Sequence, residues 1–99
     1  MAYYMMVALK KHDAEMFAKY QKLTAETLTN YEWTPLSINA PSKMIEGEAD
    51  PDVCVLLTFP DEAKFDRWWN STEYSEVKHL RHNSTNVLLA VGFDGQVLV

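Results

Sequence analysis

The chain has 99 residues, of which 47% are hydrophobic and 12% aromatic, and its formal net charge is −5. We expect a single domain over residues 1–99, because a chain of this length has room for one core, and this apolar content excludes intrinsic disorder. The acidic balance would repel a phosphate backbone, so nucleic acid is excluded as an expected partner.

The first predicted element is a strand over residues 2–9, where the apolar run AYYMMVAL ends at the charged KKHD. No basic region precedes this run, which is also too short to span a bilayer, so we expect neither a targeting segment nor a membrane partner. Asp13 is a good N-cap, with Glu15 in the following first turn. Apolar residues then recur every three or four positions, which predicts an amphipathic helix from residue 14 to about 30.

A second, half-exposed strand is predicted over residues 36–40, where apolar and polar side chains alternate. The flanking Pro35 and Pro41 confine this strand to a sheet edge or to bulged pairing. The following residues, KMIEGEADPD, can extend it to residue 46 before a turn at residues 50–52.

The clearest strand is VCVLLTF, residues 53–59, because β-branched and aromatic residues fill it. It contains Cys54, the single cysteine, which cannot form a disulfide within the chain. The pattern indicates a small buried hydrophobic side chain rather than a reactive thiolate. One such cysteine is typical of the reducing cytoplasm, where we expect the protein.

Two short helices and a last strand complete the pattern. Asp61 caps a helix through EAKFDRWWN, and Ser71 caps another through TEYSEVKHLRH after a bend. NVLLAVGF, residues 86–93, reads as a strand. The dipeptide Asp94-Gly95 favours a two-residue hairpin turn into the strand-like tail QVLV.

The element order β-α-β-β-α-β predicts an α+β, ferredoxin-like fold with a four-stranded antiparallel sheet. Right-handed crossovers place the helices on one face of that sheet and leave the other bare. The apolar strands, however, need burial on both faces. We therefore expect a homodimer in which a second copy packs against the open sheet face.

The stretch WWNSTEYSEVKHLRHNS, residues 68–84, holds most of the candidate site residues. On a helix that starts after Ser71, Tyr74 and Arg81 project inward, His79 points to the other side, and His82 lies between. A half-buried Arg81 needs a polar partner. The structural interpretation is a bond to a carbonyl or to a glutamate such as Glu73, and the alternative is a bound ligand.

Trp68 and Trp69 point about a hundred degrees apart on their helix, so one can enter the core against Phe65 while the other reaches the helix edge. Packing is the simplest role for both, and ligand stacking is the alternative. The three histidines have no carboxylate or cysteine at metal-ligand spacing beside them, so no metal site is expected.

Two functional hypotheses follow. In the first, the dimer binds an aromatic or hydroxylated metabolite, with His79 or His82 as a general base and Arg81 holding an anion. In the second, the protein is a non-enzymatic structural or regulatory dimer whose aromatic residues only fill the core and the interface. The cleft of the first hypothesis is lined by Tyr4, Met6, Tyr20, Trp68, Trp69, Tyr74, His79 and Arg81.

A family resemblance rests on five features: a strand ending in Phe59-Pro60, the aromatic pair before Asn70-Ser71, the Ser71-x-Glu73-Tyr74 step, Arg81 followed by Ser84, and a last strand reaching Gly92. With these the chain resembles the bacterial domain-of-unknown-function family 1330, in the dimeric α/β-barrel superfamily. The resemblance implies a βαββαβ fold and a dimer that closes two sheets into a barrel, without an established activity. The stretch TPLSINAPS lacks the glycine-rich start and the basic residue that members often carry.

More distant relatives in this superfamily include cofactor-free and haem-degrading monooxygenases, muconolactone isomerases and stress-responsive barrel proteins. They bind small ligands between sheet and helices, which makes a monooxygenase or isomerase a further alternative. The haem-degrading group pairs a Trp with a His ten residues later, the separation of Trp69 and His79. That group also uses an Asn on the first strand, which YYMMVAL lacks, so no haem and no other cofactor is expected.

Overall fold

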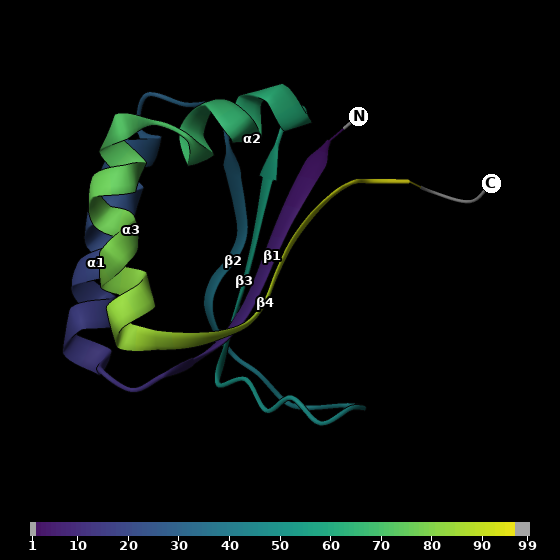
Figure 1. The fold of residues 1–99 in the computed structure, drawn as a ribbon. Coiled ribbons are helices and arrows are strands. Elements are labelled where there is room, and N and C mark those ends of the chain that lie inside the picture. Colours follow the sequence, from purple (N-terminus) through teal and green to yellow (C-terminus); the bar gives the residue numbers. More distant parts are fainter. Residues whose placement is uncertain (1, 97–99) are drawn as a thin grey trace.

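The computed structural model describes residues 2–96 of the chain. It is an antiparallel four-stranded sheet in the order β2-β3-β1-β4, with the helices on one side (Figure 1). This arrangement confirms the predicted α+β, ferredoxin-like fold. The elements are β1 (Tyr3–Lys11), α1 (Ala14–Leu28), β2 (Thr34–Pro41), β3 (Val53–Phe59), α2 (Glu62–Trp69), α3 (Thr72–Ser84) and β4 (Thr85–Asp94).

Each helix begins at the N-cap that the sequence predicts. An Asp or Ser oxygen at this position satisfies a backbone N–H that the first helical turn leaves without a partner. Helix α1 ends at Leu28, earlier than expected, because the Thr29 N–H and hydroxyl both bond to the Glu26 carbonyl and tighten the last turn. The capping bonds are Met16 N–H to Asp13 (3.0 Å), Lys64 N–H to Asp61 (2.8 Å) and Tyr74 N–H to Ser71 (3.1 Å).

The second strand lies at a sheet edge, as its flanking prolines predict. β2 pairs only with β3 among the described strands, and its register shifts twice, between Pro35 and Ser37 and between Ser37 and Ala40. The expected extension of this strand to residue 46 is wrong. β2 ends at Pro41, and residues 42–52 form a loop instead.

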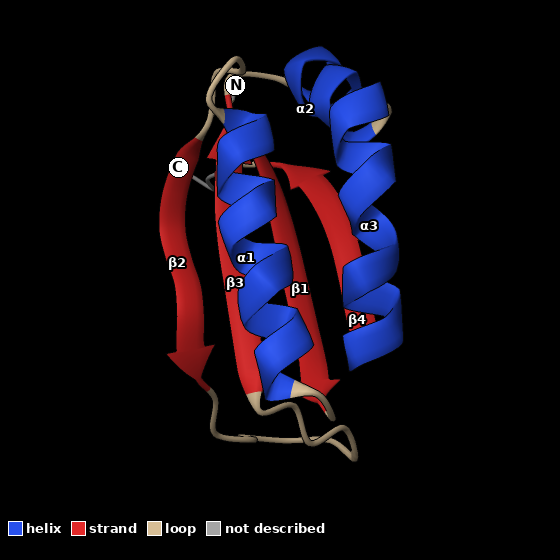
Figure 2. Cartoon of the chain, turned by 90° about the vertical axis from the view of Figure 1, so that its left-hand side faces the viewer, coloured by secondary structure: helices blue, strands red, loops and turns tan. Residues whose placement is uncertain are grey.

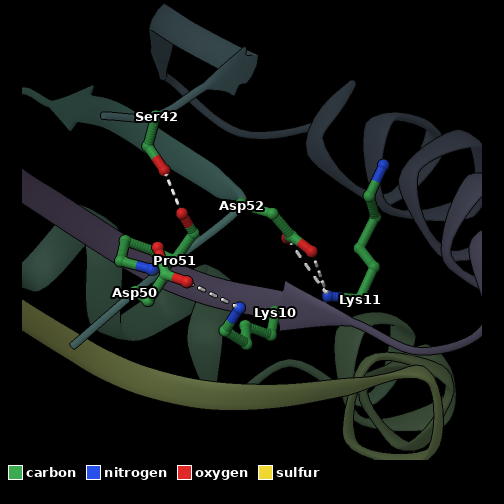
Figure 3. A network of polar contacts seen from close by, with 6 residues as sticks. All are labelled: Lys10, Lys11, Ser42, Asp50, Pro51 and Asp52. Atoms are coloured by element: carbon green, nitrogen blue, oxygen red, sulfur yellow. Dashed lines mark hydrogen bonds and ion pairs between the residues drawn. The ribbon is translucent and has the colours of Figure 1, made fainter. Parts of the chain in front are cut away.

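Polar contacts hold this loop against the end of β1 (Figure 3). The backbone groups of Leu9, Lys11 and Asp52 are satisfied in these contacts, and one further contact lies within the loop. The contacts are Lys10 Nζ to the Asp50 carboxylate (3.3 Å), Lys11 N–H to the Asp52 carboxylate (3.1 Å), Asp52 N–H to the Leu9 carbonyl (3.0 Å), and the Ser42 hydroxyl to the Pro51 carbonyl.

The hairpin turn expected at Asp94-Gly95 is not formed. The chain continues beside β1, and the Gly95 N–H donates to the Ala2 carbonyl at 2.9 Å. A type I′ turn needs positive φ at both central residues, and within residues 2–96 only Gly47 has a positive φ. The predicted strand QVLV covers residues 96–99, and its last three residues, 97–99, lie outside the described residues.

The two faces of the sheet differ in what covers them. Helices α1 and α3 cover one face of the sheet (Figure 2). Alternate residues of β1 and β3 are buried on this side and join one core with aromatic residues of the helices. No described element covers the opposite face, as Figure 1 shows. We call this surface the bare face; it consists of Tyr4, Met6, Ala8, Cys54, Leu56, Thr58, Leu89, Val91 and Phe93. Cys54 is therefore only half-buried, in contrast to the expected burial.

Candidate functional site

A cavity of about 110 Å³ lies between α1 and the helix-facing side of the sheet. Its floor consists of residues that alternate along β1 and β3, because side chains at every second position of a strand share one face. The floor residues are Met5, Val7, Leu9, Val55 and Leu57.

One face of α1 forms the wall of this cavity. Residues three and four apart on a helix lie one above the other, so the sequence brings a single stripe of α1 over the sheet. Trp33 and Ile38, next to and within β2, also contribute to the lining. The wall residues are Phe17, Tyr20, Gln21, Thr24, Ala25 and Leu28.

Aromatic side chains of α2 and α3 close the cavity against α1. The Tyr20 and Tyr74 hydroxyls share a buried hydrogen bond of 2.8 Å. Trp68 packs on Tyr74 with ring centroids 4.2 Å apart, and its indole N–H donates to the Thr27 hydroxyl at 3.1 Å. Burial, with a further contribution from Tyr20, raises the pKa of Tyr74 far above its ordinary value, so its hydroxyl stays protonated. These polar groups are thus already satisfied within the protein.

Arg81 also lines the cavity, and its side chain is not satisfied in this way. It is only 4% exposed, and its Nη2 lies 3.3 Å from His82 Nε2. Within residues 2–96, its Nε and Nη1 have no hydrogen-bond partner. Of the polar partners expected for Arg81, Glu73 does not bond to it: Glu73 lies eight residues earlier on α3, about 12 Å along the helix axis, and its carboxylate accepts from the Tyr31 hydroxyl at 2.7 Å.

The neighbours of Arg81 are themselves cationic or aromatic. Lys78 Nζ lies 4.1 Å from the Trp69 ring centroid, and the Arg81 guanidinium carbon lies 5.5 Å from the same ring. Partial desolvation and the charge of Arg81 lower the pKa of both Lys78 and His82, and Lys78 adds to the effect on His82. This end of the site is therefore a positive region in an acidic protein.

The structure brings together part of the predicted cleft. Tyr20, Trp68 and Arg81 line the cavity, with Tyr74 directly behind them and Trp69 beside Arg81. His79 is exposed on α3 and does not line it, and His82 reaches it only through its contact with Arg81.

The prediction that Tyr4 and Met6 line the same cleft is wrong. They lie on the bare face, beside Leu56 and Phe93, because they alternate with the residues of β1 that face the helices.

Sequence reasoning missed Thr24 and Val55 as lining residues. Thr24 lies four positions after Tyr20, so the helical repeat would have placed it on the same face of α1. Val55 lies two positions before Leu57 on β3, so the two side chains share one face of the sheet.

Other kinds of site have less support. Among residues 2–96, no three His, Cys, Asp or Glu side chains converge as metal ligands would. None of the helices in the described part of the chain is long and apolar enough to cross a bilayer.

Comparison with known proteins gives a family and a fold. The sequence model of DUF1330, described as a domain of unknown function, matches residues 2–92. No curated protein matches the chain.

Several solved structures share the fold. A protein of unknown function from Rhodopseudomonas palustris, RPA0582, is similar with a TM-score of 0.78 and 13% identity, covering 98% of this chain and 84% of its own. SnoaB, a cofactor-independent oxygenase from Streptomyces nogalater, is similar with a TM-score of 0.66 and 13% identity, covering 99% of this chain and 96% of its own. A dimeric ferredoxin-like protein of unknown function from Jannaschia sp. CCS1 is similar with a TM-score of 0.66 and 16% identity, covering 96% of this chain and 100% of its own. At these identities, the likeness shows the fold alone.

Proposed function

Because the chain belongs to the DUF1330 family, a family of unknown function, we propose a function from its own geometry: it binds a small aromatic or hydroxylated metabolite in the cavity between sheet and helices. The observation that carries this proposal is the cavity itself, with apolar walls and few polar groups, as is usual for ligand pockets. An apolar cavity of about 150 Å³ can hold benzene, so a cavity of about 110 Å³ suits a ligand of one ring or less.

The proposal does not include a reaction. SnoaB, which shares the fold, is an oxygenase that needs no cofactor, and a monooxygenase or isomerase activity for this chain rests on that analogy of fold alone. His82 is the histidine that contacts the site, through Arg81. Its role as a general base stays a prediction.

We further propose that the protein acts as a homodimer in which a second copy covers the bare face. The chain exposes 6430 Å², whereas a folded monomer of 11.4 kDa is expected to expose about 5,800 Å². The excess includes apolar side chains such as Leu89 and Phe93, which are 47% and 44% exposed. The dimeric neighbour from Jannaschia sp. CCS1 supports this assembly.

Cavity filling tests the binding site directly. Val55→Phe places an aromatic ring in the cavity, and we expect this variant to lose binding of phenol and benzyl alcohol. Changes in the protein's NMR chemical shifts on addition of each compound measure the binding. Val87→Phe makes the same change on the exposed part of β4, outside the lining, and should preserve binding. A crystal structure of protein purified from its host should show density in the cavity.

The structural alternative makes the opposite prediction. If the aromatic residues only fill the core, as the 1% exposure of Trp68 would also allow, no probe shifts the resonances of the lining residues. A crystal structure with interdigitated side chains and a dry, filled cleft would then decide against a binding site.

A further inference from the structure

Arg81 has a buried charge that no carboxylate among residues 2–96 neutralises. Its partner within hydrogen-bond distance is His82, and within residues 2–96 the ion pairs join other residues, Lys10 with Asp50 and Lys64 with Glu32. Burying a guanidinium without a carboxylate is costly, and buried arginines are normally paired. A buried, unpaired Arg that lines a cavity therefore indicates a group that is supplied from outside the chain.

The missing group is negatively charged. Arg81 is flanked by Lys78 and His82, and its charge repels the protonated form of each, which lowers the pKa of both side chains. An anion beside Arg81 would relieve this repulsion, whereas a neutral or cationic ligand would not. The planar guanidinium fork matches a carboxylate, which it can bind through two parallel hydrogen bonds.

The other polar atoms of the site narrow the ligand further. The hydroxyls of Tyr20 and Tyr74 bond to each other, but Thr24 Oγ1 is buried in the lining and has no hydrogen-bond partner in the described part of the chain. Arg81 and Thr24 thus offer free hydrogen-bonding capacity, and the rest of the lining is mostly apolar. The site therefore suits a ligand with one charged group attached to a small apolar group.

We infer that the cavity ligand is a small organic monocarboxylate, with one ring or a short branched chain, whose carboxylate binds Arg81. This inference rests on the proposed binding function; it limits the ligand to anions and admits a short branched chain as well as an aromatic ring. Arg81 is then the residue that selects the ligand, and Thr24 supplies an additional hydrogen bond.

Matched pairs of anionic and neutral probes test the charge class. Calorimetry should show that benzoate binds about tenfold or more tightly than benzamide. Isobutyrate should show the same advantage over isobutyramide. Each neutral amide keeps the shape of its acid but loses the charge-assisted hydrogen bond to Arg81. Arg81→Gln should remove this preference while the affinity for the amides stays within about threefold. The same change at exposed Arg67 on α2 should leave both affinities unchanged.

Stability measurements separate a binding role of Arg81 from a structural one. Arg81→Met removes a buried unpaired charge and should raise the urea midpoint without ligand, whereas it should lower the midpoint if the guanidinium holds the fold together. A lowered midpoint in Arg81→Met would overturn the inference.

The binding results also distinguish the inference from the proposed function. If wild type binds amide and acid equally, or if Arg81→Gln keeps the preference for the acid, the inference fails and the cavity remains a ligand site. If neither member of either pair binds, the inference fails, and the proposed function fails with it when phenol and benzyl alcohol also do not bind.

Discussion

Tyr74 and Arg81 lie on the same inward face of α3, seven residues apart. The described residues satisfy the hydrogen-bonding groups of Tyr74 but not all of those of Arg81. The Tyr74 hydroxyl bonds to Tyr20, whereas two nitrogens of Arg81 have no partner among the described residues. Buried polar groups in proteins are nearly always hydrogen-bonded, so this contrast separates a structural residue from a candidate for ligand binding. The difference depends on which neighbours reach each side chain.

We expect Tyr20→Phe to destabilise the protein by about 1–3 kcal/mol, because it leaves the fully buried Tyr74 hydroxyl unpaired. The double variant Tyr20→Phe/Tyr74→Phe should cost less than the sum of the two single changes, since no orphaned hydroxyl remains. Urea unfolding of the four proteins measures this coupling, and Tyr4→Phe on the bare face serves as the control. Strictly additive costs would show that the bond contributes nothing.

The pKa of His82 should depend on Arg81. Partial desolvation and the charges of Arg81 and Lys78 lower the pKa of His82 from its ordinary value of 6.5. The unfolded state then binds more protons below this pH, so stability should fall as the pH drops from about 6.5 through the folded pKa. We expect Arg81→Gln to raise the pKa of His82 in an NMR titration, while Arg67→Gln leaves it unchanged. An unaltered titration in Arg81→Gln would contradict this origin.

At the level of elements, the junction between α2 and α3 positions the aromatic side of the cavity. The Ser71 hydroxyl accepts from the Tyr74 N–H and donates to the Trp68 carbonyl at 2.7 Å. One side chain therefore ends one helix and starts the next. It fixes Trp68 and Tyr74 relative to each other.

Ser71→Ala should destabilise the protein by about 1 kcal/mol, because α3 loses its N-cap. Ser75→Ala is the matched control within the same helix; its side chain is exposed, and alanine there should be neutral or slightly stabilising. Thermal unfolding of both variants compares the two sites. Equal effects at both positions would mean that the cap is not important for stability.

The last strand approaches β1 closely at Gly92. A Cβ built there would lie 2.2 Å from the Tyr3 hydroxyl oxygen and 2.7 Å from its Cζ. Gly92→Ala should therefore displace the Tyr3 ring from Phe65, at 5.2 Å between centroids, and cost about 1–3 kcal/mol. In a Tyr3→Leu background the same change should cost much less. A similar cost in both backgrounds would refute the steric explanation.

At the scale of the whole molecule, residues 2–96 form one helix layer and one sheet, so no described element covers the second face of the sheet. The principal extents of 37 × 35 × 16 Å describe such a thin molecule. Strands that are apolar on both faces are typical of sheets covered on both sides. This mismatch is what the proposed dimer resolves.

Val91→Glu should therefore convert the proposed dimer to a monomer. Val91 is 37% exposed on the bare face, paired with Met6, and a carboxylate there would be buried without a partner in a sheet-to-sheet interface. Sedimentation analysis at micromolar concentration should show a dimer for wild type and for Ala18→Glu, which adds the same charge to the exposed part of α1. A monomeric wild type would reject the assembly.

The sequence by itself determined the element order, the N-caps at Asp13, Asp61 and Ser71, and the edge position of the second strand. These features depend on local rules, namely hydrophobic periodicity, capping chemistry and the missing N–H of proline. The inward direction of Arg81 also followed from helical spacing.

Only the tertiary structure decided which of these residues meet. It separated Tyr4 and Met6 from the cavity, placed the Glu73 carboxylate against Tyr31, and replaced the expected turn at residues 94–95 with continued pairing along β1. Each outcome is a contact between residues far apart in sequence. Local propensity cannot choose among such partners, because the choice depends on strand order and on competition for the same polar group.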